Sequence, residues 1–79
     1  MNQELLRAID LALNGNWEQS HEIVQSLEAD ATASWIHAVL HKIEGDQNNS
    51  RYWYNRAAKI EHFQDEPKSE LQKIRSMLV

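Results

Sequence analysis

The 79-residue chain contains no cysteine, only two glycines and only one proline. The absence of cysteine excludes disulfide bonds and thiolate metal ligands, so packing or association must stabilise the fold. Because glycine and proline mark most tight turns, their scarcity favours helices over a β fold with many turns. A chain of this length is expected to form a single domain, residues 1–79.

An excess of positive charge and long apolar runs are also missing. The net charge is −4, and nucleic-acid binding needs clustered lysine and arginine. The longest stretch without Asp, Glu, Lys or Arg is residues 31–41, whereas a membrane span needs about 20 apolar residues. The first ten residues show no basic segment followed by an apolar run, so we expect no signal peptide. The expected location is the cytoplasm, with no nucleic-acid or membrane partner.

Five segments repeat apolar residues at helical spacing, near residues 2–13, 16–29, 31–44, 47–61 and 67–78. They predict an all-α fold of about five short helices, paired as antiparallel hairpins with a C-terminal capping helix. We expect N-caps at Asn16, with Gln19 as its capping-box partner, at Asp30 and at Asp46, and we expect Pro67 in the first turn of the last helix. The predicted core faces comprise Met1, Leu5, Ala8, Ile9 and Ala12; Trp17, Ser20, Ile23, Val24 and Leu27; Ile36, Val39, Leu40 and Ile43; Asn49, Ser50, Trp53, Ala57 and Ile60; and Leu71, Ile74 and Leu78.

Two helix–turn–helix segments superimpose at a shift of 30 residues, with glycine in each turn and small residues in both helices. The matched positions are Ala8, Gly15, Asn16, Trp17 and Ser20 with Ala38, Gly45, Asp46, Gln47 and Ser50. Over residues 2–60 this pattern resembles the tetratricopeptide (TPR) repeat, whose turn reads glycine, polar, aromatic, two variable residues and a small residue. The resemblance implies stacked hairpins, with the last helix as a cap. The period is shorter than in that family, and no proline closes either repeat.

A second resemblance is local. Residues 35–46, followed by Asn49 and by Tyr52, Trp53 and Tyr54, match the pattern WIHxxLHxxEGDxxNxxYWY. This run is similar to a motif in small bacterial proteins of uncharacterised function. The resemblance implies no activity, but it marks these residues as the ones that define the protein.

The candidate functional residues are polar side chains on the middle helices. His37, His41 and Glu44 follow one another at helical spacing and share one stripe. His21 occupies the matching flank of the preceding helix, and Tyr52 and Tyr54 bracket Trp53, the expected core aromatic. One interpretation is a buried hydrogen-bond network in which His37 and His41 meet the tyrosine hydroxyls.

Two chemical interpretations compete with that network. Two histidines one helical turn apart can bind one divalent metal ion, so His37, His41 and Glu44 are the candidate metal ligands, with His21 as a further ligand. Alternatively, His41 with Glu44, or His21 with Glu22, could act in acid–base chemistry. No nucleophile motif and no glycine-rich phosphate loop accompanies them, which favours a non-enzymatic role without deciding it.

The sequence as a whole favours a small interaction module that binds a protein or peptide, without a cofactor. Helical repeats commonly act as binding surfaces, although the fold alone is a weak argument for function. Arrays of helical hairpins usually need three units for stability. This chain has two and a half, and the shortfall favours self-association as a homodimer. Leu6, Leu11 and Leu13 could supply apolar surface for it, unless the last helix covers them. The alternative function is a small-molecule or metal site built from the histidines and Glu44.

Overall fold

The computed structural model describes residues 2–79, so the expectation for Met1 lies outside the described residues. The chain forms five α-helices and one 3-10 turn, in the order α1 (Asn2–Leu13), α2 (Trp17–Gln25), α3 (Ala31–Glu44), α4 (Gln47–Ala57), η1 (Ile60–His62) and α5 (Pro67–Leu78). No strand occurs in this part of the chain, and the predicted all-α class is confirmed. Across residues 2–79 no helix combines the length and the apolar character that a bilayer span requires.

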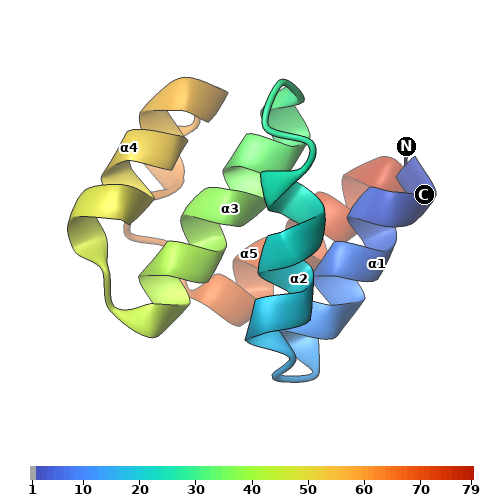
Figure 1. The fold of residues 1–79 in the computed structure, drawn as a ribbon. Helices are drawn as coiled ribbons and strands as arrows, with labels where there is room; N and C mark the ends of the chain where they lie inside the picture. The colour runs from blue at the N-terminus through green and yellow to red at the C-terminus, as the bar shows by residue number, and fades with distance from the viewer. Residues whose placement is uncertain (1) are drawn as a thin grey trace.

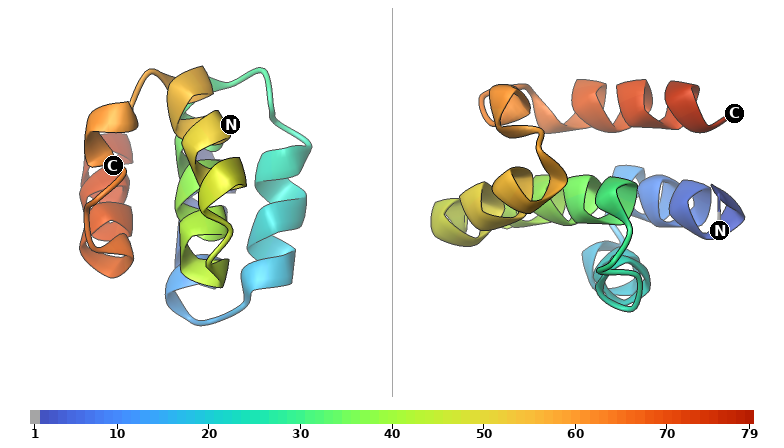
Figure 2. Two further views of the ribbon diagram at one scale, coloured as in Figure 1. Left: turned by 90° about the vertical axis from the view of Figure 1, so that its left-hand side faces the viewer. Right: turned by 90° about the horizontal axis from the view of Figure 1, so that it is seen from above.

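The central element is α3. It lies between α4 and α1, with α2 on one side and α5 crossing the opposite side (Figure 1; Figure 2). It contacts all four of these helices. Every residue from Ala33 to His41 is therefore buried, although only some of them are apolar. This burial places two histidines inside the fold.

Both hairpins turn in the same way, as the 30-residue shift predicts. Gly15 and Gly45 have φ angles of 82° and 87°, the left-handed conformation that ends helices and that glycine adopts without a steric penalty. In each turn the backbone amide of the residue after the glycine donates a hydrogen bond to the carbonyl five residues earlier. The Asn16 amide donates to the Leu11 carbonyl at 2.8 Å, and the Asp46 amide donates to the His41 carbonyl at 2.9 Å.

The helices of each hairpin also cross in the same way. The Ser20 hydroxyl donates to the Ala8 carbonyl at 2.7 Å, and the Ser50 hydroxyl donates to the Ala38 carbonyl at 2.9 Å. All four residues are fully buried. Small side chains let the paired helices approach closely at these points. The two hairpins therefore share the conformation of their turns and the contact at which their helices cross. The fuller likeness to TPR repeats stays a prediction.

The predicted helix ends are partly confirmed. Asp30 and Asp46 accept hydrogen bonds from the amides of Ala33 and Asn49, and Pro67 begins α5. The capping box of Asn16 is wrong, because its side chain makes no cap hydrogen bond. Helix α2 ends earlier than predicted, at Gln25, where a series of turns begins.

The predicted core faces need corrections in α4 and at the end of α3. This helix ends at Ala57 rather than near residue 61, because Ala58 takes a left-handed conformation with φ 57°. Ile60 is thereby left 43% exposed, and Ile43 at the end of α3 is 45% exposed. Tyr54, not Trp53, is the fully buried aromatic of α4. Ser50 and Ala57 of the predicted face are buried as expected, Asn49 is exposed, and the buried aromatic lies one position later than predicted.

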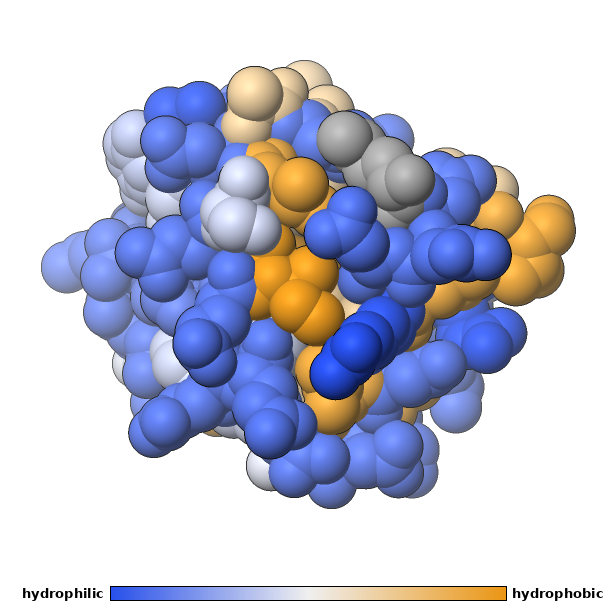
Figure 3. All heavy atoms as spheres, turned by 45° about the vertical axis from the view of Figure 1, so that its right-hand side comes forward, coloured by the Kyte–Doolittle hydropathy of each residue, from blue (hydrophilic) through white to orange (hydrophobic). Residues whose placement is uncertain are grey.

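A groove separates α1 from α2 on the outside of the first hairpin. It encloses about 470 Å³, and Leu11 and Ile23 are the apolar residues in its lining. Figure 3 views this side of the molecule and shows apolar surface among polar side chains. The polar lining residues are Glu4, Arg7, Gln19, Glu22 and Ser26.

Candidate functional site

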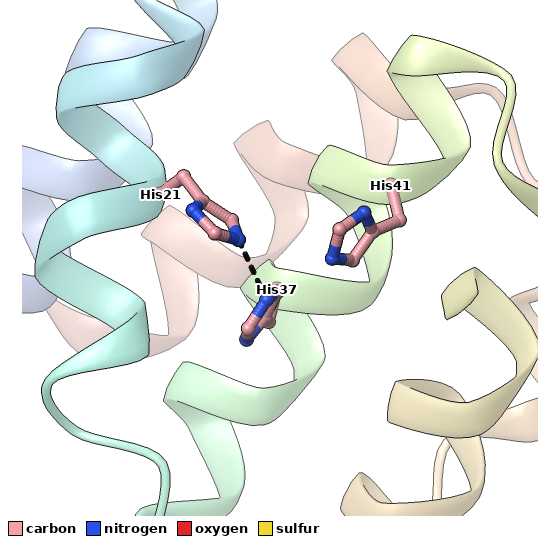
Figure 4. Close-up of side chains that lie close together, drawn as sticks. All are labelled: His21, His37 and His41. Atoms are coloured by element: carbon pink, nitrogen blue, oxygen red, sulfur yellow. Dashed lines mark hydrogen bonds between the residues drawn. The ribbon is translucent and has the colours of Figure 1, made fainter.

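Three of the predicted site residues come together as a cluster of imidazoles. His21 reaches across from α2 to His37 and His41 on α3 (Figure 4). The ring centroids are 4.7 Å apart for His21 and His37, 5.4 Å for His21 and His41, and 4.9 Å for His37 and His41. His37 and His41 are buried and His21 is half-buried. We call these three residues the histidine cluster.

The ring nitrogens of the histidine cluster face one another. One nitrogen from each ring can be chosen so that all three lie within 4.8 Å of one another. Nε2 of His37 is 3.0 Å from Nε2 of His21, a distance at which one must donate and the other accept. Nδ1 of His41 lies 2.6 Å from a Glu44 carboxylate oxygen, and the other nitrogen of His41 points toward the remaining two rings (Figure 4).

One nitrogen of the cluster is left over. Nδ1 of His37 is buried and has no hydrogen-bond partner. A buried polar group without a partner costs roughly 1–3 kcal/mol. This nitrogen therefore lowers the stability that the cluster contributes to the fold.

Two tryptophans cover the flanks of the histidine cluster. Trp17 stacks on His21 at 4.8 Å, and Trp53 stacks on His37 at 4.0 Å. Trp17 is held in place because its indole N–H donates to the Leu40 carbonyl at 2.7 Å. It begins α2 directly after the Gly15 turn, one helical turn before His21, so the turn sets the position of both residues.

Burial keeps His21 and His37 uncharged. Desolvation, and next the neighbouring His21, lower the pKa of His37 to about 3. Desolvation, and next His41, also lower the pKa of His21. Neutral imidazoles have a lone pair on one ring nitrogen, which is the form that binds metal ions. Both residues are therefore in that form at neutral pH.

The geometry is close to that of a three-histidine metal site. Ligand nitrogens lie about 2.0–2.1 Å from zinc, which puts them roughly 3.3 Å from one another in a tetrahedral arrangement. The shortest separation in the cluster is 3.0 Å and the span is within 4.8 Å. Small side-chain rotations would bring all three nitrogens onto one ion.

Glu44, a predicted ligand, lies beside the histidine cluster and contacts His41 only at Nδ1. A carboxylate at that nitrogen fixes the orientation of the ring and leaves the other nitrogen free to bind, as in many zinc sites. The side chain of Asp46 is also near, and His41, Glu44 and Asp46 form a second group of possible ligands. Glu44 is thus better placed to orient a ligand than to be one.

The two tyrosines do not join the cluster, which corrects the prediction of a histidine–tyrosine network. Tyr52 is 51% exposed, and its hydroxyl lies 3.4 Å from Arg56 Nη1, which donates to it. The Tyr54 hydroxyl donates to Glu70 on α5. Tyr54 and not Trp53 is the core aromatic of α4, so Trp53 stacks on His37 and the Tyr54 hydroxyl reaches Glu70.

A second polar cluster, absent from the prediction, lies where α5 packs on α3. The buried Glu70 accepts hydrogen bonds from Trp35 Nε1 at 2.8 Å, Lys42 Nζ at 2.7 Å and the Tyr54 hydroxyl at 2.7–2.8 Å. Lys42 Nζ is also within hydrogen-bond distance of three backbone carbonyls, those of His62 at the end of η1 and of Phe63 and Asp65 after it. We call Trp35, Lys42, Tyr54 and Glu70 the Glu70 cluster.

A signal for this second cluster was present in the sequence. Glu70 is one residue before Leu71 and four before Ile74, so it lies on the apolar stripe of α5. A carboxylate on such a stripe must find a buried donor. Which donor it finds depends on how α5 crosses α3, and the sequence does not contain that information.

Comparisons with protein-family models, with curated proteins and with solved structures found no match for this chain. The function must therefore be inferred from its own residues.

Proposed function

We propose that this domain binds one divalent transition-metal ion through His21, His37 and His41. The observation that carries the proposal is the convergence of three ring nitrogens, from two helices, within 4.8 Å. Imidazole nitrogen is a preferred ligand of zinc, copper, nickel and iron. Of the predicted ligands, His37 and His41 are kept, His21 becomes the third, and Glu44 takes the role of orienting His41.

Three properties of the cluster support this proposal. The Nε2 atoms of His21 and His37 face each other with no carboxylate between them, which suits a ligand site better than a structural ion-pair network. The lowered pKa values of His21 and His37 leave both rings neutral. The stacked indoles restrict the rings, which reduces the conformational entropy lost on binding.

The test is a titration of the untagged, chelator-treated chain with Zn²⁺ and Co²⁺, by calorimetry and by visible absorption. We expect one ion per chain and the visible bands of four-coordinate cobalt. His37→Phe keeps an aromatic ring against Trp53 but removes a ligand, and we expect it to lower the affinity by at least about 100-fold, more than the loss of a supporting residue costs.

The matched control is His62→Gln, because His62 is the one histidine of the chain outside the cluster. This variant should keep the wild-type affinity. Circular dichroism would confirm that both variants are folded. If His37→Phe and His21→Phe bind as tightly as the wild type, the proposal is wrong.

A second candidate function is the predicted binding of a protein, a peptide or a second copy of the chain. The groove between α1 and α2 favours it, since Leu11 and Ile23 provide apolar contact inside a polar rim. Sedimentation at high protein concentration tests the homodimer. We expect a mass above that of the monomer that falls in Leu11→Glu, and a monomer throughout would remove the homodimer.

A further inference from the structure

The residues around the histidine cluster supply three ligand atoms and no obvious fourth. Glu44 is 2.6 Å from His41 Nδ1, on a nitrogen that points away from the other rings. Asp46 accepts from the backbone and side-chain nitrogens of Asn49 at 3.2 and 2.7 Å, as the N-cap of α4. The indole N–H of Trp17 donates to a backbone carbonyl and cannot bind a cation. Each neighbouring polar group is thus engaged elsewhere.

The cluster is covered unevenly. Trp17 stacks on His21, and Trp53 stacks on His37. His37 and His41, both on α3, are buried. His21 is only half-buried. An ion held by the three nitrogens is therefore shielded on its flanks and reachable from solvent on the His21 side.

The charge of the bound ion determines which ligand its fourth coordination position would attract. Three neutral imidazoles leave the full 2+ charge of a divalent ion uncompensated, unlike sites that include thiolates or carboxylates. Partial burial strengthens the attraction of that charge for an anion. Structural zinc sites are closed by four protein ligands, whereas sites with three protein ligands keep a water or an external ligand in the fourth position.

On the basis of the metal site proposed above, we infer that the bound ion keeps an exchangeable fourth position, which takes water or a small anion. The inference assigns the site to the open type of metal centre. An ion of this type polarises the water or anion that it binds. Glu44 then holds His41 in position and does not act as the fourth ligand.

Azide is the probe for this inference, used on the cobalt-loaded full chain. We expect azide to shift the visible cobalt bands in a saturable way, with free acetate as a weaker competitor. Asp46→Asn should show the same shift as the wild type, because Asp46 caps α4 and does not occupy the fourth position. Glu44→Gln should weaken cobalt binding, because Glu44 orients His41, but the cobalt that binds should still respond to azide.

Each other outcome overturns the inference in a distinct way. Cobalt bands that do not respond to azide mean a closed site, while the metal-binding function itself stands. A response found only in Glu44→Gln or only in Asp46→Asn means that the replaced carboxylate is the fourth ligand. The absence of cobalt bands removes the proposed function and this inference together.

Discussion

The histidine cluster and the Glu70 cluster pack against different faces of α3 and bury polar groups in opposite ways. Glu70 accepts from three side chains, and its Lys42 partner is within hydrogen-bond distance of four oxygens, so charge meets opposite charge. In the histidine cluster like groups face one another, and Nδ1 of His37 has no partner. A network that pairs opposite charges points to a structural role, whereas ring nitrogens that converge with no carboxylate between them favour a ligand.

The two clusters also differ in what they join. The Glu70 cluster ties α5 and the segment after η1 to α3 and α4, within the part of the chain that closes the fold. The histidine cluster joins α2 to α3, and hence the first hairpin to the second. A metal ion there would link the two repeats at a point where α2 and α3 otherwise meet through few polar contacts.

The largest effect is expected from the Glu70 cluster. Glu70→Gln leaves Lys42 as an uncompensated buried cation, since the side chains of this pair are 0% and 15% exposed. Breaking a buried ion pair in this way costs about 3–5 kcal/mol, which matches the whole stability of a domain this small. Urea denaturation followed by circular dichroism should show a largely unfolded variant.

Two controls sharpen that result. Lys42→Met combined with Glu70→Gln removes both charges and should recover much of the stability, because no charge is left unpaired. Glu61→Gln changes an exposed carboxylate and should leave the unfolding midpoint nearly unchanged. A Glu70→Gln variant as stable as the wild type would show that the two clusters do not differ in their contribution to folding.

A smaller effect, with a characteristic pH dependence, is expected from the histidine cluster. The folded pKa of His37 is about 3, below its ordinary value of 6.5, so the unfolded chain binds a proton that the folded chain does not. The contribution of this residue to stability is complete above pH 6.5 and is lost as the pH falls toward 3. By pH 5 the loss is about 2 kcal/mol, at roughly 1.4 kcal/mol per pH unit.

The measurement is the free energy of unfolding between pH 5 and pH 7 in the presence of a chelator, compared between the wild type and His37→Phe. In the variant the free energy of unfolding should depend much less on pH, and at pH 5 the variant should be the more stable of the two. His62→Gln should keep it. Parallel curves for the wild type and His37→Phe would mean that His37 is solvated, which would contradict its burial and weaken the metal site as well.

Much of the fold could be predicted from local sequence. Helix periodicity gave the five helices, and Gly15, Gly45, Asp30, Asp46 and Pro67 act at helix ends as their chemistry requires. The repeat was also visible, because a close crossing needs small residues at fixed spacing. Predicting Asn16 as a capping box failed, because its side chain makes no cap hydrogen bond, although Asp46 caps α4 from a similar backbone conformation.

The candidate site could be predicted only in part. The spacing of His37 and His41 placed them on one stripe, but Trp53 was assigned to the core face of α4 in place of Tyr54. That error exchanged Trp53 for Tyr54 and produced a histidine–tyrosine network that the structure does not contain. On a helix with aromatics at three successive positions, periodicity alone cannot choose which one faces inward, since each can cover apolar surface.

The sequence by itself determined the helices, most of their ends and the equivalence of the two hairpins, since these depend on residues close together in the chain. Only the tertiary structure decided which polar side chains meet. His21 and His37 are 16 positions apart and Trp35 and Glu70 are 35 apart, and their contacts depend on how α2 and α5 cross α3. The physical reason is that helix crossing follows from the packing of whole helix faces, to which every residue on each face contributes.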